Sequence, residues 1–152
     1  MRLVARRICV TGSWLLVVAV LAQLLLAGLG SLVSSAFFVW HSSVGSGAVA
    51  LFALVVAGSA ALGHVRGAAR TGAGIVGLVI VQCLLLLAGI VGLVTGQSLL
   101  LVPTVVDVTP WLWAISVLHA LPAVLILLLA VRLAWRLTGQ QRAQPGARPR
   151  GC

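Results

Sequence analysis

Residues 8–30, ICVTGSWLLVVAVLAQLLLAGLG, form a long apolar segment near the start of the chain. A helix that crosses the hydrocarbon core of a bilayer needs about 20 predominantly apolar residues. This segment is long enough, and no Asp, Glu, Lys or Arg occurs from position 8 to position 65. It therefore predicts a membrane-spanning helix, and the rest of the chain can be compared with it.

Three further segments have the same character: residues 44–63, 72–94 and 111–131. Charged residues make up only 7% of the chain, whereas about 25% is typical of soluble proteins, which excludes a soluble monomer. We expect an all-α membrane protein, a bundle of four transmembrane helices formed by residues 1–136. Residues 137–152 are rich in Pro, Gly and Arg, and they predict a disordered cytoplasmic tail.

The placement of arginine predicts the direction of each helix. Arginines precede the first span, join the second to the third and follow the fourth, while the outer connections have no Lys or Arg. Because cytoplasmic loops carry the excess of Lys and Arg, we expect both termini on the cytoplasmic side of the plasma membrane. The same placement beside apolar segments argues against nucleic acid as a partner, although the net charge is +9.

The first span also has features of a secretion signal. MRLVARR is a basic leader, and its pair Arg6-Arg7 resembles part of a twin-arginine signal. The apolar segment is longer than the roughly 7–15 residues of a signal-peptide core, and the rest of the twin-arginine pattern is missing. We therefore expect the first span to be retained.

Two segments of the chain resemble each other. VLAQLLLAGLG begins at Val20, VIVQCLLLLAGIVG begins at Val79, and the two align with one inserted leucine. Each lies in a predicted outward-running helix and is followed by an outer connection, a histidine and a returning helix. This predicts two helical hairpins of the same orientation, related by an approximate axis along the membrane normal, as in parallel repeats.

The predicted spans contain few polar side chains. Buried amides and imidazoles must find hydrogen-bond partners in lipid, so we expect Gln23 and Gln82 to join helices, an interaction worth about 0.6 kcal/mol on average. Pro122 lacks the N–H that would bond the carbonyl of Leu118, which predicts a local bend beside His119. Small residues predict close helix approach: Gly58, Gly74, Gly77, Gly89 and Gly92.

These residues resemble the pattern of a family of small four-helix membrane proteins of unknown function that is common in actinobacteria. The pattern is Gln followed by Ala-Gly, then His and Gly entering the second helix, Gln in the third and LHxxxA in the fourth. The same layout is similar, more distantly, to one half of the haem A synthase bundle, whose catalytic acid has no counterpart here. The matching positions are Gln23, Ala27, Gly28, His41, Gly45, Gln82, His119 and Ala123.

The more distant resemblance implies haem b as a cofactor, with His41 and His119 as its ligands. Residue counts predict different depths for these two histidines, since His119 lies 13 residues before Arg132 and His41 lies 25 residues before Arg66. The difference corresponds to about 18 Å at a rise of 1.5 Å per residue. We therefore expect His41 to lie well outside the level of His119, so that ligation of one haem would require an offset of the helices.

The sequence provides little for catalysis. Acid–base and nucleophilic enzymes need carboxylates or a nucleophile with an oriented base, and Asp107, the only acidic residue, falls in an outer loop. The cysteines Cys9, Cys83 and Cys152 form no CxxC pair, so neither a disulfide framework nor a metal site is expected. This predicts a protein that is not an enzyme.

The first functional interpretation is a non-catalytic membrane protein that self-associates as a homo-oligomer or is an accessory to a larger membrane complex, with the lipid bilayer as its surroundings. The alternative is a small haem-binding protein for electron transfer or haem handling. A transporter or channel is a third class, but the predicted helices lack the polar stripe that such a pathway needs.

Overall fold

The computed structural model describes residues 2–34, 36–65, 67–99 and 109–142. Asp107 and its loop, Arg66 and the tail after Arg142 lie outside the described residues. The elements are α1 (Arg2–Leu32), α2 (Phe37–Ser43), the π-helix η1 (Val44–Val49), α3 (Ala50–Leu62), α4 (Ala68–Leu99) and α5 (Thr109–Arg142). Because α2, η1 and α3 follow one another without a break, they form one continuous rod. All of these elements are helices, so the predicted all-α fold is confirmed.

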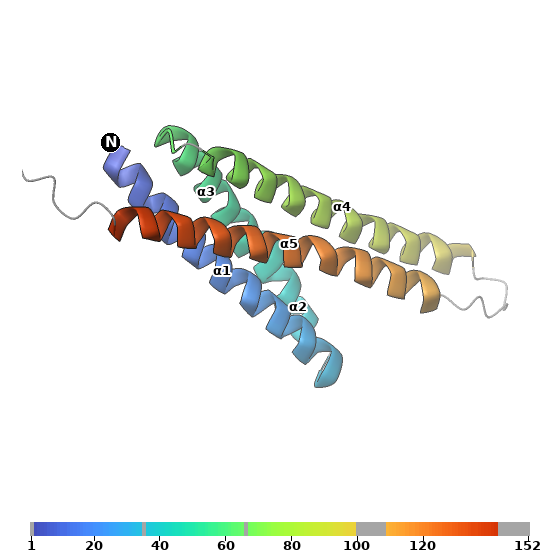
Figure 1. Ribbon diagram of the computed structural model, residues 1–152. Helices are drawn as coiled ribbons and strands as arrows, with labels where there is room; N and C mark the ends of the chain where they lie inside the picture. The colour runs from blue at the N-terminus through green and yellow to red at the C-terminus, as the bar shows by residue number, and fades with distance from the viewer. Residues whose placement is uncertain (1, 35, 66, 100–108, 143–152) are drawn as a thin grey trace, which may run out of the picture.

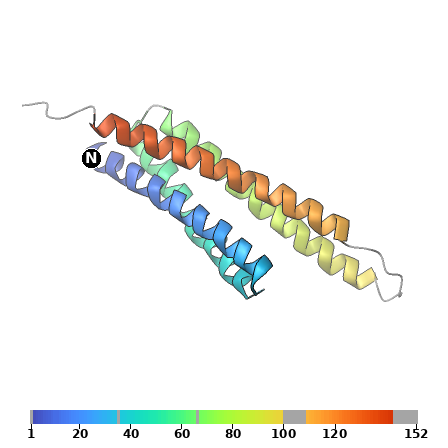
Figure 2. The ribbon, with the colours of Figure 1, turned by 60° about the horizontal axis from the view of Figure 1, so that its bottom comes forward.

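The helices pack as a ring in which α1 contacts α3 and α5, and α4 contacts the same two helices. The first hairpin consists of α1 with the α2–η1–α3 rod, and the second consists of α4 with α5. Figure 1 and Figure 2 show that the two hairpins lie close together at the end that carries the N-terminus and diverge toward the opposite end. The bundle therefore has a closed end and an open end.

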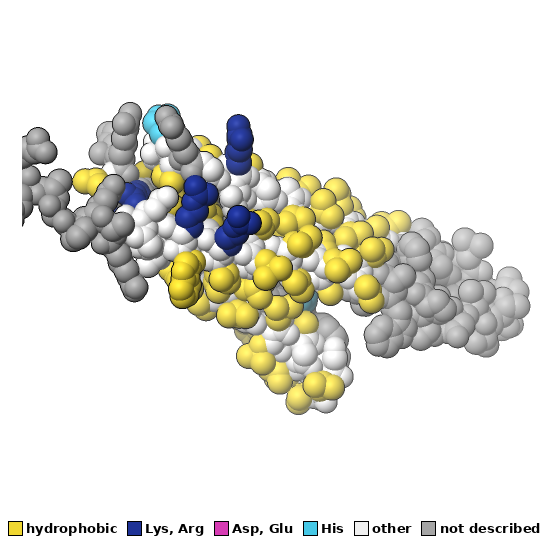
Figure 3. All heavy atoms as spheres, viewed as in Figure 1, with side chains coloured by type: hydrophobic (Ala, Val, Ile, Leu, Met, Phe, Trp, Pro, Cys, Tyr) yellow, Lys and Arg dark blue, Asp and Glu magenta, His cyan; other side chains and the backbone are white. Residues whose placement is uncertain are grey.

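Four helical segments are long and apolar enough to cross a bilayer: Leu3–Leu32, Val39–Leu62, Ala68–Ala88 and Val117–Gln140. Large apolar side chains cover the outside of the bundle, where Leu25 is 64% exposed and Leu128 is 60% exposed. Figure 3 shows this apolar surface along the helices and the arginines gathered toward the closed end. An outside of this kind is solvated by lipid, and the chain is a multi-pass membrane protein.

Small and branched side chains fill the core. The central cluster includes Leu16 and Val20 of α1, Ile75 of α4 and Ile126 of α5. A second cluster at the closed end includes Cys9, Val56, Ala68, Leu133 and Leu137.

The close approach of α3 and α4 depends on Gly72, where an added Cβ would lie 2.8 Å from the Cα of Ala57. The prediction of close approach was wrong for Gly58, Gly74 and Gly77, since an added Cβ at any of them meets nothing within 4 Å. Those three positions lie on the outer face of the bundle. The surroundings of Gly89 and Gly92 are outside the described residues.

Two helices extend beyond the segments predicted for them. The second span was expected to begin at residue 44, but its helix begins at Phe37, so His41 is a helical residue rather than part of a connection. The tail was expected to begin at residue 137, but α5 continues to Arg142. It continues because Leu137 is only 1% exposed within the closed-end cluster, and Trp14 Nε1 donates a hydrogen bond to Thr138 Oγ1 at 3.2 Å.

Candidate functional site

In the first hairpin, Gln23 of α1 and His41 of α2 are joined by two hydrogen bonds. The Nδ1 atom of His41 lies 2.8 Å from the backbone oxygen of Gln23. The side-chain Nε2 of Gln23 donates to the backbone oxygen of His41 at 3.5 Å. Because a carbonyl oxygen only accepts, Nδ1 of His41 carries the hydrogen and Nε2 carries the ring's lone pair.

In the second hairpin, Gln82 of α4 pairs with His119 of α5. The Nε2 atom of Gln82 lies 3.2 Å from Nε2 of His119. An amide nitrogen only donates, so the imidazole accepts here and its hydrogen is on Nδ1. That Nδ1 atom is buried and has no hydrogen-bond partner among the described residues. Each hairpin thus contains a glutamine from its first helix paired with a histidine from its second helix. The internal repeat predicted this order of the two residues but not their pairing.

The two histidines meet across the boundary between the hairpins. The ring centroids of His41 and His119 are 6.1 Å apart and the ring planes are inclined by 64°. The predicted depth difference of about 18 Å is therefore wrong. Residue counts measure the relative depth of two residues correctly only when their helices are parallel and are counted from reference points at the same level. Here the hairpins diverge (Figure 1), and α5 continues past Arg132 to Arg142.

The π-helix η1 begins three residues after His41 and positions the first pair. Single π-turns within α-helices are frequent at functional sites. Gly45 lies in η1, and an added Cβ there would collide with the side-chain amide of Gln23. The absence of a side chain at Gly45 thus leaves the space through which Gln23 reaches the histidine helix.

Two hollows flank the histidine pair, and all four polar residues line both of them. The first, here named the α2–α4 hollow, has a volume of about 170 Å³ and is also lined by Ser42, Gly45, Ser46 and Cys83. The second, the α1–α5 hollow, has a volume of about 250 Å³ and is also lined by Ser31, Ala27, Ala120 and Ala123. In the ring of helices these are opposite gaps, and both separate one hairpin from the other.

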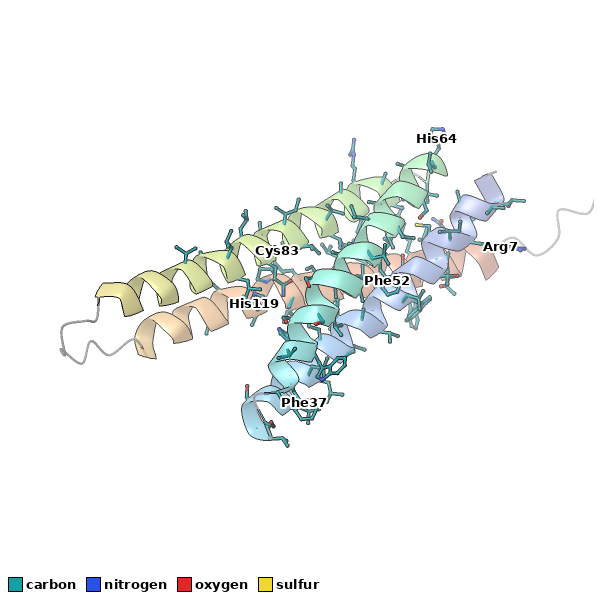
Figure 4. The ribbon with its side chains drawn as sticks, turned by 180° about the vertical axis from the view of Figure 1, so that it is seen from behind. Arg7, Phe37, Phe52, His64, Cys83 and His119 are labelled. Atoms are coloured by element: carbon teal, nitrogen blue, oxygen red, sulfur yellow. The ribbon has the colours of Figure 1, made fainter. Side chains whose placement is uncertain are left out.

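The site lies where the hairpins begin to diverge. Figure 4 shows His119 and Cys83 near the crossing of the helices, with Phe37 at the open end and His64 at the closed end. Pro122 lies one turn after His119 within α5, which continues through it as an α-helix. No group of three or more His, Cys, Asp or Glu side chains within the described ranges is arranged to hold a metal ion.

The sequence identified the four polar residues of the cluster, and the structure brings all of them together. It missed the serines at positions 31, 42 and 46, and it did not place Cys83 at the α2–α4 hollow. Helical spacing was a usable signal, since Gly45 follows His41 by four residues and Ser46 follows Ser42 by four. That signal was hidden because residues 37–43 were taken as a connection.

Comparison of the chain with protein-family models, with curated proteins and with solved structures finds no match. The fold and the cluster therefore define the class by themselves: a multi-pass membrane protein of four helices with a Gln–His pair in each hairpin. Whether the chain belongs to the actinobacterial family remains a prediction.

Proposed function

We propose that this chain is a non-enzymatic membrane protein that binds one haem b between its two hairpins, and that His41 and His119 would hold its iron. The observation that carries the proposal is the distance of 6.1 Å between the ring centroids. Two imidazoles on opposite faces of one iron have centroids about 6 Å apart, because each metal–nitrogen bond is about 2 Å long and each nitrogen lies about 1 Å from its ring centre.

The surroundings of His41 support the same proposal. A ligating histidine almost always donates its other ring N–H to a carbonyl or carboxylate, which fixes its orientation. The bond from Nδ1 of His41 to the backbone oxygen of Gln23 is of this type. The amide of Gln82 would have to turn away from Nε2 of His119, which would leave a neutral imidazole of the kind that holds haem iron.

The two hollows provide space on both sides of the histidine pair. An apolar cavity of about 150 Å³ accepts a benzene ring, and both hollows exceed that volume. A flat macrocycle between the histidines would extend into both gaps between the hairpins. Bound haem would supply one-electron chemistry, consistent with a role in electron transfer or haem handling.

The Soret absorbance of the purified full-length protein tests the proposal. We expect a band after addition of haem b that His41→Gln and His119→Gln both abolish, since an amide does not replace imidazole as an iron ligand. His64→Gln removes the third histidine, which lies away from the site, and should keep the band. A band that is unchanged in both His41→Gln and His119→Gln would show that these histidines do not hold the iron.

A second candidate is an accessory membrane protein without a cofactor, in which the polar residues only join helices. The bond between Gln82 and His119 favours it, because that bond already uses Nε2 of the imidazole. Absence of any Soret band, together with normal folding of the His119→Gln variant, would support this candidate. In either case we propose the plasma membrane as the location, with the arginine-rich closed end on the cytoplasmic side.

A further inference from the structure

The closed end of the bundle carries cations that no carboxylate in the described part of the chain neutralises. Asp107 is the only acidic residue in the sequence, and it lies outside the described residues. Figure 3 shows several arginine side chains projecting from this end. Anions from the surroundings must therefore balance this charge, and an anionic membrane surface attracts basic residues close to it.

One hollow at this end lies beside two of these cations, Arg70 and Arg136. Its volume is about 570 Å³, and its lining includes His64, Gly67 and Arg70 from the turn between α3 and α4 and from the first turn of α4. Here we name it the His64 hollow. The guanidinium of Arg136 approaches from α5, with Nη1 3.3 Å from the position of an added Cβ at Gly67. The N-terminus of α4 begins at Ala68 and adds the positive end of its helix dipole.

His64 is held in an unfavourable backbone conformation at the mouth of this hollow. Its φ angle is 49°, and it is the only non-glycine residue with positive φ in the described part of the chain. Only a few per cent of non-glycine residues adopt this conformation, with Asn, Asp and His more frequent among them than other residues. Strain of this kind is concentrated at ligand sites. His64 also lines a second hollow, together with Arg6 and Gln140, so it lies between two hollows.

Three glycines on the outer faces of α3 and α4, here named the glycine strip, follow the His64 hollow toward the middle of the bundle. Gly74 follows Arg70 by one helical turn on α4, and Gly58 precedes Ala61 by about one turn on α3. An added Cβ at Gly58, Gly74 or Gly77 meets nothing within 4 Å. The strip is apolar and open to the bilayer, so it suits an acyl chain.

We propose that the His64 hollow binds the phosphodiester headgroup of an anionic phospholipid. Arg70 and Arg136 provide charge-assisted donors, and His64 provides a ring N–H. The acyl chains lie along the glycine strip on the outer faces of α3 and α4. Free phosphate shares the headgroup chemistry but would leave this strip unused. The proposal does not depend on the cofactor, because His64 lies at the opposite end of α3 from the Gln–His cluster.

Native mass spectrometry of the delipidated full-length protein tests this proposal by titration with phosphatidylglycerol and phosphatidylcholine. We expect selective binding of phosphatidylglycerol, weakened roughly tenfold by Arg70→Gln, as for the loss of one hydrogen bond to a charged group. His64→Asn should also weaken binding without loss of folding, since Asn tolerates a positive φ. Arg132→Gln is the matched control, because it removes the same charge from an exposed position that lines neither hollow.

Three outcomes would overturn the proposal. One is equal binding of the two lipids. A second is the same loss of affinity in Arg132→Gln as in Arg70→Gln, which would indicate unspecific attraction to a basic surface. A third is displacement of phosphatidylglycerol by inorganic phosphate at similar concentration, which would make the hollow a site for a soluble anion.

Discussion

Gly45 controls the geometry of the first Gln–His pair because it has no side chain. The amide of Gln23 occupies the space where a Cβ would be and reaches the backbone oxygen of His41 from there. Gln23 is only 6% exposed, so a displaced amide would lose its partner in an environment without water. An unsatisfied buried amide of this kind is costly.

Gly45→Ala should therefore destabilise the protein by about 1–3 kcal/mol, as expected for overpacking. Gly47→Ala is the matched control in the same π-helix, since an added Cβ there meets nothing within 4 Å. It should be neutral or stabilise the helix by about 0.5–1 kcal/mol. Thermal unfolding of the full-length protein in detergent measures both effects. Equal behaviour of the two variants would show that Gln23 moves aside freely.

The residues of the Gln–His cluster could be predicted from the sequence, but the contact between its two histidines could not. Glutamine and histidine are conspicuous in apolar segments, which is why Gln23, Gln82 and His119 could be selected from the sequence. The contact between His41 and His119 depends on helix inclination. Helices that are apolar on all sides give no periodic signal of the face that packs inward, so this inclination could not be inferred.

The C-terminal part of α5 is a structural element that the sequence assigned to a tail. Arginine was taken to mark the end of the fourth helix, but a long arginine side chain can reach the membrane surface from within a continuing helix. Leu137 and Thr138 lie beyond the last predicted helical arginine and still pack against α1 and the closed-end cluster. Arginine therefore marks a depth in the membrane rather than a helix terminus.

Two truncations distinguish the contribution of the end of α5 to stability from that of the residues that follow it. Deletion of residues 143–152 should leave thermal stability unchanged, because their composition offers little apolar surface to bury. Deletion of residues 137–152 also removes Leu137, which is 1% exposed, and should cost about 2–5 kcal/mol. Thermal unfolding of the two truncated proteins beside the full-length chain measures the difference. A loss as large in the shorter deletion would mean that the tail docks on the bundle.

For the whole molecule, four spans and their antiparallel order followed from the sequence, since the bilayer requires long apolar helices. The divergence of the hairpins did not follow, because it depends on how closely particular helices approach. Gly72 brings α3 against α4, whereas Gly58 and Gly74, of the same residue type, face outward. Composition alone does not separate these two environments.

The orientation of the whole molecule is tested by labelling in intact cells. Ser34 lies in the exposed connection between α1 and α2 at the open end, and Ser34→Cys should react with a membrane-impermeant maleimide. The unaltered chain is the control, because it measures the labelling of the native cysteines. Among these, Cys152 should react only after the cells are lysed. Labelling of Cys152 in intact cells, with Ser34→Cys protected, would contradict the predicted topology.

The location of each Gln–His pair within one hairpin has a consequence for biogenesis. Helical hairpins insert into a membrane before they associate with each other, and both partners of each pair belong to the same hairpin. Each Gln–His pair can therefore form before the hairpins meet, and docking then brings the two imidazoles together and forms the two hollows. We therefore expect the proposed haem to be enclosed as the two hairpins associate, rather than to enter a cavity that has already formed.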